Sequence, residues 1–154
     1  MSYSKIMAQT QFTAPTIRRR PAETYPTAAP TTYDLFTVTG NILLLALSAV
    51  VTVLMPAGAK TIAVRANAVA MDNTAYDLVN NAVGTRIIVH GAVAVETIIS
   101  AMAASSVTTA TLPWVVCPGT IDFILSTNGT VAGALMWEIE YVPLTEDASV
   151  VVAV

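Results

Sequence analysis

Asn128 and Gly129 lie between two stretches in which apolar and polar residues alternate, and this pattern constrains the fold more than any other feature of the sequence. The alternating apolar residues are Ile121, Phe123 and Leu125 before the pair and Trp137, Ile139 and Tyr141 after it. Alternation with a period of two is typical of a β-strand with one buried face, and Asn-Gly favours the positive φ angles of a tight turn. The pattern predicts a β-hairpin over residues 120–142, with its aromatic side chains in a core and Glu138 and Glu140 in water.

Short apolar segments that end at turn residues continue through the rest of the chain. The strands expected from them are residues 34–39, 42–55, 61–71, 85–90, 92–99 and, at a sheet edge, 148–152. The second of these segments is longer than a typical strand, so we expect either one bent strand or two. Residues 94–104 also permit a helix, and the sequence leaves that choice open. Many short strands separated by turns predict an all-β fold, either an antiparallel β-sandwich or a jelly-roll-like domain.

Charge and proline content separate the first 33 residues from residues 34–154. The first part holds four cations against one carboxylate, a net charge of +3, and half of the eight prolines: Lys5, Arg18, Arg19, Arg20, Glu23, Pro15, Pro21, Pro26 and Pro30. The second part holds three cations against nine carboxylates, a net charge of −6. Proline excludes a continuous helix and favours extended backbone in the residue before it. The sequence therefore predicts an extended, basic, Pro-rich N-terminal arm at residues 1–33 and a β-sandwich body at residues 34–154.

The arm is the candidate partner-binding element, through Arg18, Arg19, Arg20 and Tyr25. Guanidinium groups bind phosphates or carboxylates. Three of them make a weak nucleic-acid site, because affinity follows the number of phosphates neutralised, and a sequence pI near 4.9 opposes nucleic-acid binding by the whole domain. We expect an acidic protein surface, on which the arm lies as an extended strand. A solvated charge run without a partner is the alternative.

The composition, 55% hydrophobic and only 11% charged, is unusual for a soluble monomer. A membrane span is disfavoured because the apolar run at residues 42–55 is only 14 residues long and has β-branched residues at positions 50–53 of its second half. We expect instead an oligomer whose subunits cover one another, a surface of Thr, Ser and Asn, or both. The N-terminus lacks the apolar stretch of a secretory signal, so synthesis in the cytoplasm is expected.

Residues capable of catalysis or metal binding are few. His90 is the only histidine, and no nucleophile motif accompanies it, so a structural role is expected. Asp72, Asn73 and Asp77 lack the spacing of a calcium loop and are expected to form Asx turns. Cys117, the only cysteine, is expected to be a small buried hydrophobe. We therefore predict a non-enzymatic protein with no catalytic, metal or cofactor site.

Two segments, YDLFTVTGNI at residues 33–42 and NGTVAGALMWEIEYVPLTEDASVVVA at residues 128–153, resemble small virion structural proteins of tailed bacteriophages, most closely capsid decoration or cement proteins. The resemblance covers residues 33–154 as an order of strands. It implies a β-rich body that self-associates, with a trimer favoured, and a terminal extension that grips the shell. The implied partners are the major capsid protein and other copies of the chain, with no direct nucleic-acid or membrane contact. The implied location is the capsid surface of the virion.

Two other classes of protein remain open. A tail fibre or receptor-binding module would share the β-rich body, and it would be expected to present an aromatic residue such as Trp114 in a carbohydrate groove. A small hydrolase would require His90 to be essential for activity.

Overall fold

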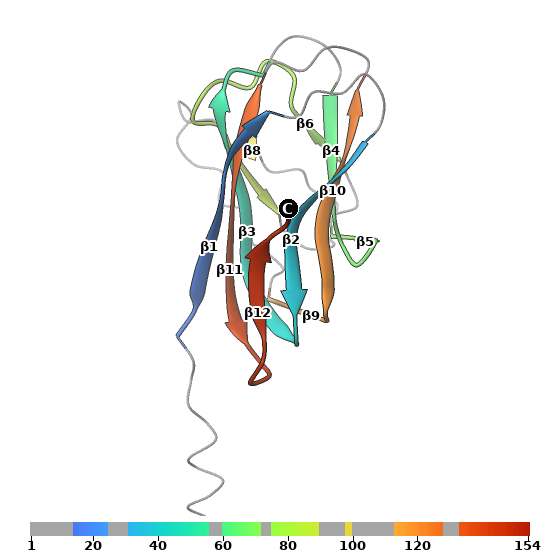
Figure 1. The fold of residues 1–154 in the computed structure, drawn as a ribbon. Helices are drawn as coiled ribbons and strands as arrows, with labels where there is room; N and C mark the ends of the chain where they lie inside the picture. The colour runs from blue at the N-terminus through green and yellow to red at the C-terminus, as the bar shows by residue number, and fades with distance from the viewer. Residues whose placement is uncertain are drawn as a thin grey trace, which may run out of the picture.

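The structure, a computed structural model, is a sandwich of two antiparallel β-sheets, and the residues that it describes contain no helix (Figure 1). These residues are 14–24, 31–55, 60–71, 75–89, 98–99, 113–127 and 133–154. Sheet A, on the left in Figure 1, contains in spatial order β1 (Thr16–Thr24), β11 (Ala134–Pro143), β3 (Ile42–Val53), β7 (Arg86–Val89) and β8 (Ile98–Ile99), with β9 (Trp114–Val116) also paired to β3. Sheet B contains β12 (Ser149–Val152), β2 (Thr31–Thr39), β10 (Gly119–Thr127), β4 (Lys60–Ala66) and β5 (Val69–Ala70), with β6 (Tyr76–Asp77) also paired to β4. The predicted all-β sandwich is confirmed.

The strand order is that of a jelly roll. If β8, β9 and β12 are not counted and β5 and β6 count as one strand, eight strands remain. In chain order, β1, β11, β3 and β7 of sheet A are the first, eighth, third and sixth of these eight strands. The strands of sheet B are the second, seventh, fourth and fifth. Neighbours in each sheet are therefore mostly distant in sequence, as two interlocked Greek keys require.

The hairpin predicted over residues 120–142 is wrong, although both of its strands exist. β10 pairs with β2 and β4 in sheet B, whereas β11 pairs with β1 and β3 in sheet A. The two strands face each other across the core, where Phe123 stacks on Trp137 with ring centroids 5.5 Å apart and Tyr33 stacks on Phe123 at 5.4 Å. Alternation thus identified the buried face of each strand but not its neighbour. Asn128 and Gly129 lie outside the described residues.

Within the apolar segment at residues 42–55, residues 42–53 form one long strand, β3, whose pairing with β11 shifts register at two points. Glu140 of β11 pairs with Ala46, and the next residue, Tyr141, pairs with Leu44, so Leu45 is the extra residue. A bulge bends a strand and increases its twist. The side chains that alternate into the core are fully buried: Ile42, Leu44, Leu47, Ala49 and Val51. Of the two expectations, one bent strand is the one confirmed.

The segment at residues 61–71 is not one strand, as predicted, but two joined by a turn. Asn67 and Ala68 have φ angles of 51° and 64°, and β4 and β5 pair on either side of them. A two-residue hairpin needs positive φ at both central positions. The side chain of Asn67 holds this turn against the start of β10, because its Oδ1 accepts from the N–H of Thr120 at 3.0 Å and its Nδ2 donates to the carbonyl of Cys117 at 3.2 Å.

Three other predicted segments have partial outcomes. Residues 85–90 contain β7, residues 148–152 contain β12 at the edge of sheet B as predicted, and residues 92–99 contain β8. Apart from the two residues of β8, the segment at residues 94–104, for which helix or strand was left open, lies outside the described part of the chain.

The boundary predicted at residue 33 does not separate the arm from the sandwich, because β1 is a full member of sheet A and β2 begins at Thr31. Pro21 is tolerated because β1 is an edge strand and because its pairing with β11 shifts between Arg20 and Glu23. The prolines of this segment thus limit β1 to an edge position but do not exclude it from a sheet. Residues 1–13 precede β1 and lie outside the described residues.

Candidate partner-binding surfaces

The three consecutive arginines lie on β1 and alternate between its two faces. Arg18 and Arg20 are opposite Ile139 and Trp137, whose side chains are buried, so both arginines face the gap between the sheets. Arg19 is opposite Glu138 and faces outward with it. The sequence predicted the three arginines as one basic cluster. In the extended backbone of β1, neighbouring arginines instead have different environments. Tyr25, the fourth candidate, lies outside the described residues.

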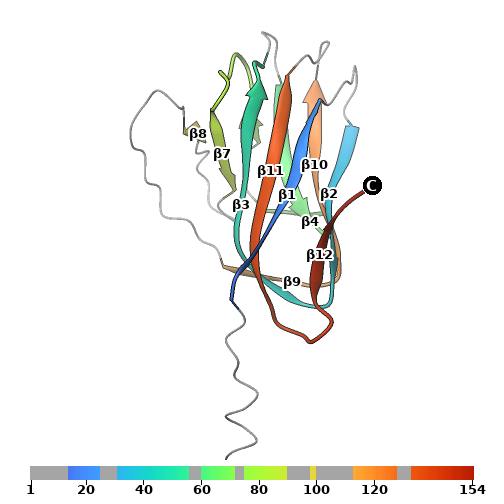
Figure 2. The same ribbon diagram turned by 60° about the vertical axis from the view of Figure 1, so that its left-hand side comes forward.

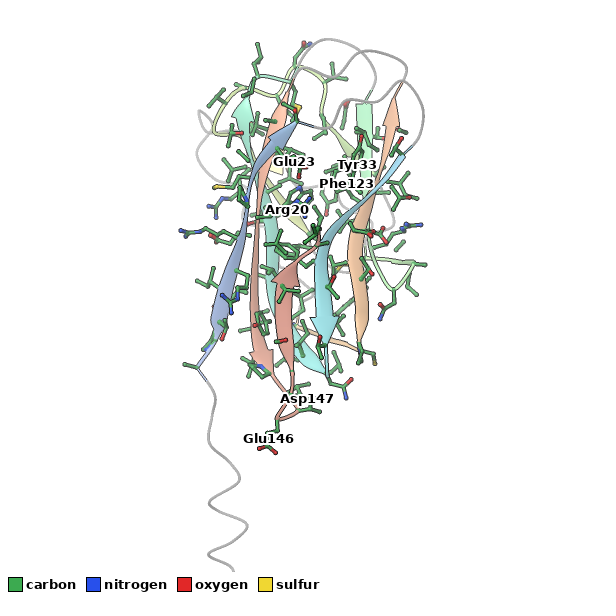
Figure 3. The ribbon with its side chains drawn as sticks, in the orientation of Figure 1. Arg20, Glu23, Tyr33, Phe123, Glu146 and Asp147 are labelled. Carbon is green, nitrogen blue, oxygen red and sulfur yellow. The ribbon has the colours of Figure 1, made fainter. Side chains whose placement is uncertain are left out.

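Arg20 connects the two sheets at their open side. Its Nη1 donates to the carbonyl oxygens of Leu35 at 3.1 Å and Ala153 at 2.7 Å, and its Nη2 lies 2.8 Å from Glu23 Oε2. Figure 3 shows Arg20 and Glu23 side by side on β1. The side chain of Arg20 is only 13% exposed. Most of its donors are therefore used within the chain, which makes Arg20 a structural link between β1, β2 and the C-terminal residues.

A groove of about 700 Å³ runs along the same open side, between the edge strands of the two sheets. Its walls come from β1 and β12: Ile17, Arg18, Arg19, Val150, Val151 and Val152. Ile17 and Val151 are 51% and 53% exposed. Among the described residues Arg18 makes no ion pair, whereas Arg19 pairs with Glu138. The groove is therefore suited to bind an extended polypeptide that carries a carboxylate. The two sheet edges offer backbone hydrogen bonds, the apolar walls contact side chains, and Arg18 offers a cation for the carboxylate.

The outer face of sheet A is a second surface, which was not among the sites predicted from the sequence. In Figure 2 this face is turned toward the viewer, with β11, β3 and β7 across its centre. The half-buried residues that it presents are mainly apolar: Leu43, Ala46, Val50, Ile88, Met136 and Val142. The outer face of sheet B is instead polar, with Thr32, Thr37, Thr39, Thr61, Thr120 and Ser126. Polar outward residues are usual where one face of an antiparallel sheet meets water, so sheet A is the exception.

A signal for this surface was present in the sequence. The segment at residues 42–55 is apolar at both alternating sets of positions, unlike residues 137–141, in which Glu138 and Glu140 alternate with apolar residues. A strand that is apolar on both sides is expected where both of its faces are covered. Nothing in the sequence indicated that Arg86 and Glu140 lie near each other on this face, because the strands that carry them are brought together by β3, from a distant part of the chain.

The residues considered for chemistry do not form a site in the described part of the chain. His90, Asp72 and Asn73 lie outside it. Asp77 accepts a hydrogen bond from the N–H of Val79 at 2.9 Å, which is the Asx turn that was expected. No group of His, Cys, Asp and Glu side chains within the described residues is arranged to hold a metal ion.

Two further predictions concern single side chains near β9. Cys117 is exposed, so the prediction that it is buried is wrong. The reason is that Val116 of β9 points into the core, and Cys117 follows it at the bend that leads into β10. Trp114 is half-buried and packs against the core.

None of the described residues forms a helix with the length and hydrophobicity needed to cross a lipid bilayer. Protein-family models, curated proteins and solved structures were each compared with the chain, and none of them matches it.

Proposed function

We propose that this protein is a non-enzymatic structural component of a virion, a capsid decoration or cement protein of a tailed bacteriophage head. In this role it binds the major capsid protein and further copies of itself on the capsid surface. It stabilises the shell by burying area across subunit joints, and the residues before β1 serve as an anchor. The resemblance of residues 33–42 and 128–153 to such proteins led to this proposal.

The observation that carries the proposal is the apolar outer face of sheet A. The central strand of this face, β3, has half-buried apolar residues on the side away from the core. A chain with 11% charged residues has few groups with which to keep such a face in water. Burial against other subunits accounts for both features at once. Jelly-roll domains are common among viral capsid proteins, but they are also found in lectins, so the fold alone does not decide between them.

The receptor-binding alternative has less support. A sugar-binding groove presents an aromatic ring flat to the ligand, whereas Trp114 packs against the core and is only half-exposed. Saturable binding of the protein to an array of glycans would favour that alternative over the decoration role.

The test of the proposal is binding to purified capsids of the phage that encodes the chain, prepared without this protein. Full-length protein is expected to co-sediment with these capsids at a saturable, fixed ratio and to raise the temperature at which they rupture. Absence of saturable binding would reject the decoration role.

The anchor is tested with a shortened chain that lacks only residues 1–13. Removing residues 1–32 would also remove β1 from sheet A, so a loss of binding would then report unfolding as well as anchoring. The shorter deletion is expected to keep the thermal unfolding temperature of the full chain and to lose capsid occupancy. Equal occupancy would reject the anchoring role and leave the decoration role standing.

A further inference from the structure

Within the part of the chain that the structure describes, two charged residues on the outer face of sheet A have no ion-pair partner. Among the described residues, Arg86 of β7 and Glu140 of β11 make no ion pair. They border a shallow hollow of about 180 Å³ whose lining includes the small residues Ala46 and Ser48 of β3. The other two charged residues of this region, Arg19 and Glu138, pair with each other. The charges of these four described residues therefore balance, and among them one cation and one carboxylate are left without an ion pair.

The sheet register places Arg86 and Glu140 symmetrically about Ser48. Ser48 pairs with Glu138 on one side and with Ile88 on the other. Glu140 is two residues beyond Glu138 and pairs with Ala46, whereas Arg86 is two residues before Ile88 and pairs with Val50. The two charges thus lie on opposite neighbouring strands, displaced by equal steps in opposite directions along the strands.

This arrangement is self-complementary. Consider a second copy laid face to face on sheet A, related by a twofold axis that passes over Ser48 in the plane of the contact. With that axis perpendicular to the diagonal from Arg86 to Glu140, each Arg86 comes to lie over the Glu140 of the other copy. A twofold contact brings the same patch of both subunits together, so both pairs form at once.

We propose that two copies of the chain associate through the outer faces of their sheets A, with reciprocal Arg86–Glu140 ion pairs and Ser48 on the axis. The proposal rests on the self-association included in the proposed function, and it names the face and the pairing. The apolar side chains of β3 and β11 supply the buried area, and the ion pairs set the orientation.

The size of the face is adequate for such a contact. At a strand spacing of about 4.8 Å and roughly 3.3 Å per residue, about nine residues each of β1, β11 and β3 and the four residues of β7 cover about 500 Å² before side-chain relief is counted. Stable interfaces bury about 800 Å² on each partner. The outer face of sheet B has a similar extent, but its Thr and Ser side chains are already suited to water.

Charge exchange tests the pairing. In sedimentation velocity over a range of concentrations, the wild-type chain is expected to associate in an even number of copies. Arg86→Glu alone and Glu140→Arg alone should each weaken the association about tenfold or more, because each creates two repulsive pairs. The double variant should return to within about threefold of the wild type. Arg18→Glu, at the groove on the other side of β1, is the matched control and should leave the association unchanged.

A position on the twofold axis gives an independent readout. Ser48→Cys in a Cys117→Ser background should be joined to its own copy by a short bis-maleimide linker, because the axis brings the two thiols together. Thr37→Cys in the same background, on the outer face of sheet B, should not be joined. The proposal would be overturned if both cysteine variants were cross-linked alike or if the wild type formed a trimer. It would also be overturned if the double charge variant did not recover the association of the wild type.

The experiments in solution need no capsid, so together with the capsid-binding assay they separate the two proposals. Twofold association without capsid binding would retain the contact and reject the decoration role. Capsid binding by a chain that stays monomeric in solution and is not cross-linked on the capsid through position 48 would do the reverse.

Discussion

Arg20→Met removes the guanidinium group that connects the two sheets and keeps an unbranched apolar side chain in place of the arginine stem. The two carbonyl oxygens that it loses as partners, those of Leu35 and Ala153, lie 3.1 Å and 2.7 Å from Nη1. Hydrogen bonds from a charged donor contribute about 1.5 to 3 kcal/mol each.

Compensation reduces the net loss. The carbonyl of Leu35 keeps a bond from the N–H of Ala153 at 3.1 Å, and Ala153 is partly accessible to water. The ion pair with Glu23 adds at most a few tenths of a kcal/mol, because Glu23 is 46% exposed. A net loss of about 2 kcal/mol remains, which for a chain of this length lowers Tm by about 4 to 8 °C.

The matched control is Arg18→Met, which makes the same change two residues earlier on the same face of β1. Arg18 makes no ion pair in the described part of the chain, so its replacement should cost less than about 0.5 kcal/mol. Urea unfolding followed by circular dichroism, with both variants at one protein concentration, measures the difference. Hydrogen exchange at the amide of Ala153 should become faster in Arg20→Met alone. If the two variants lose the same stability, the role assigned to Arg20 is refuted.

Three other changes have defined outcomes. Ala68→Gly should raise the free energy of unfolding by about 0.5 to 1 kcal/mol, because glycine adopts the φ of 64° without strain, and no gain in chemical denaturation would contradict this. Asp122→Ala should lower the free energy of unfolding by about 3 kcal/mol, because it removes the carboxylate that lies 2.6 Å from the partly buried Arg65. The double variant Arg65→Met with Asp122→Leu should recover most of this loss in the same assay. Cys117 should react fully with a thiol reagent in the native state, and reaction only after addition of denaturant would show that it is buried.

Local patterns in the sequence determined the strands but not their partners. The alternation around Phe123 and Trp137 correctly predicted which side chains are buried. It did not predict that β10 and β11 belong to different sheets, because an Asn-Gly pair between two strands fits a connection across the core as well as a tight hairpin. Strand partners in a jelly roll are set by contacts between distant segments, and a single sequence holds no local signal for them.

The candidate surfaces were predictable to different degrees. The arginines of the arm were identified, but the burial of Arg20 depends on β2. There, Phe36 pairs with Ile121 and Asp34 pairs with Asp122, so Leu35 is an extra residue whose carbonyl accepts the bond from Arg20. No residue near Arg20 in the sequence indicates such a bulge. The apolar outer side of β3 was readable from its composition, whereas the positions of Arg86 and Glu140 around Ser48 required the register.

The pairing of β1 with β11 also has a mechanical consequence. Antiparallel backbone hydrogen bonds are perpendicular to their strands, and β1 is paired with β11 on both sides of its bulge. A pull along the axis of β1, applied through the residues that precede it, therefore loads these bonds in shear, and they resist together instead of opening one after another. Such a force passes from β1 to β11 and then to β3, the central strand of sheet A, so the sandwich resists tension best in the direction in which its N-terminal segment enters the sheet.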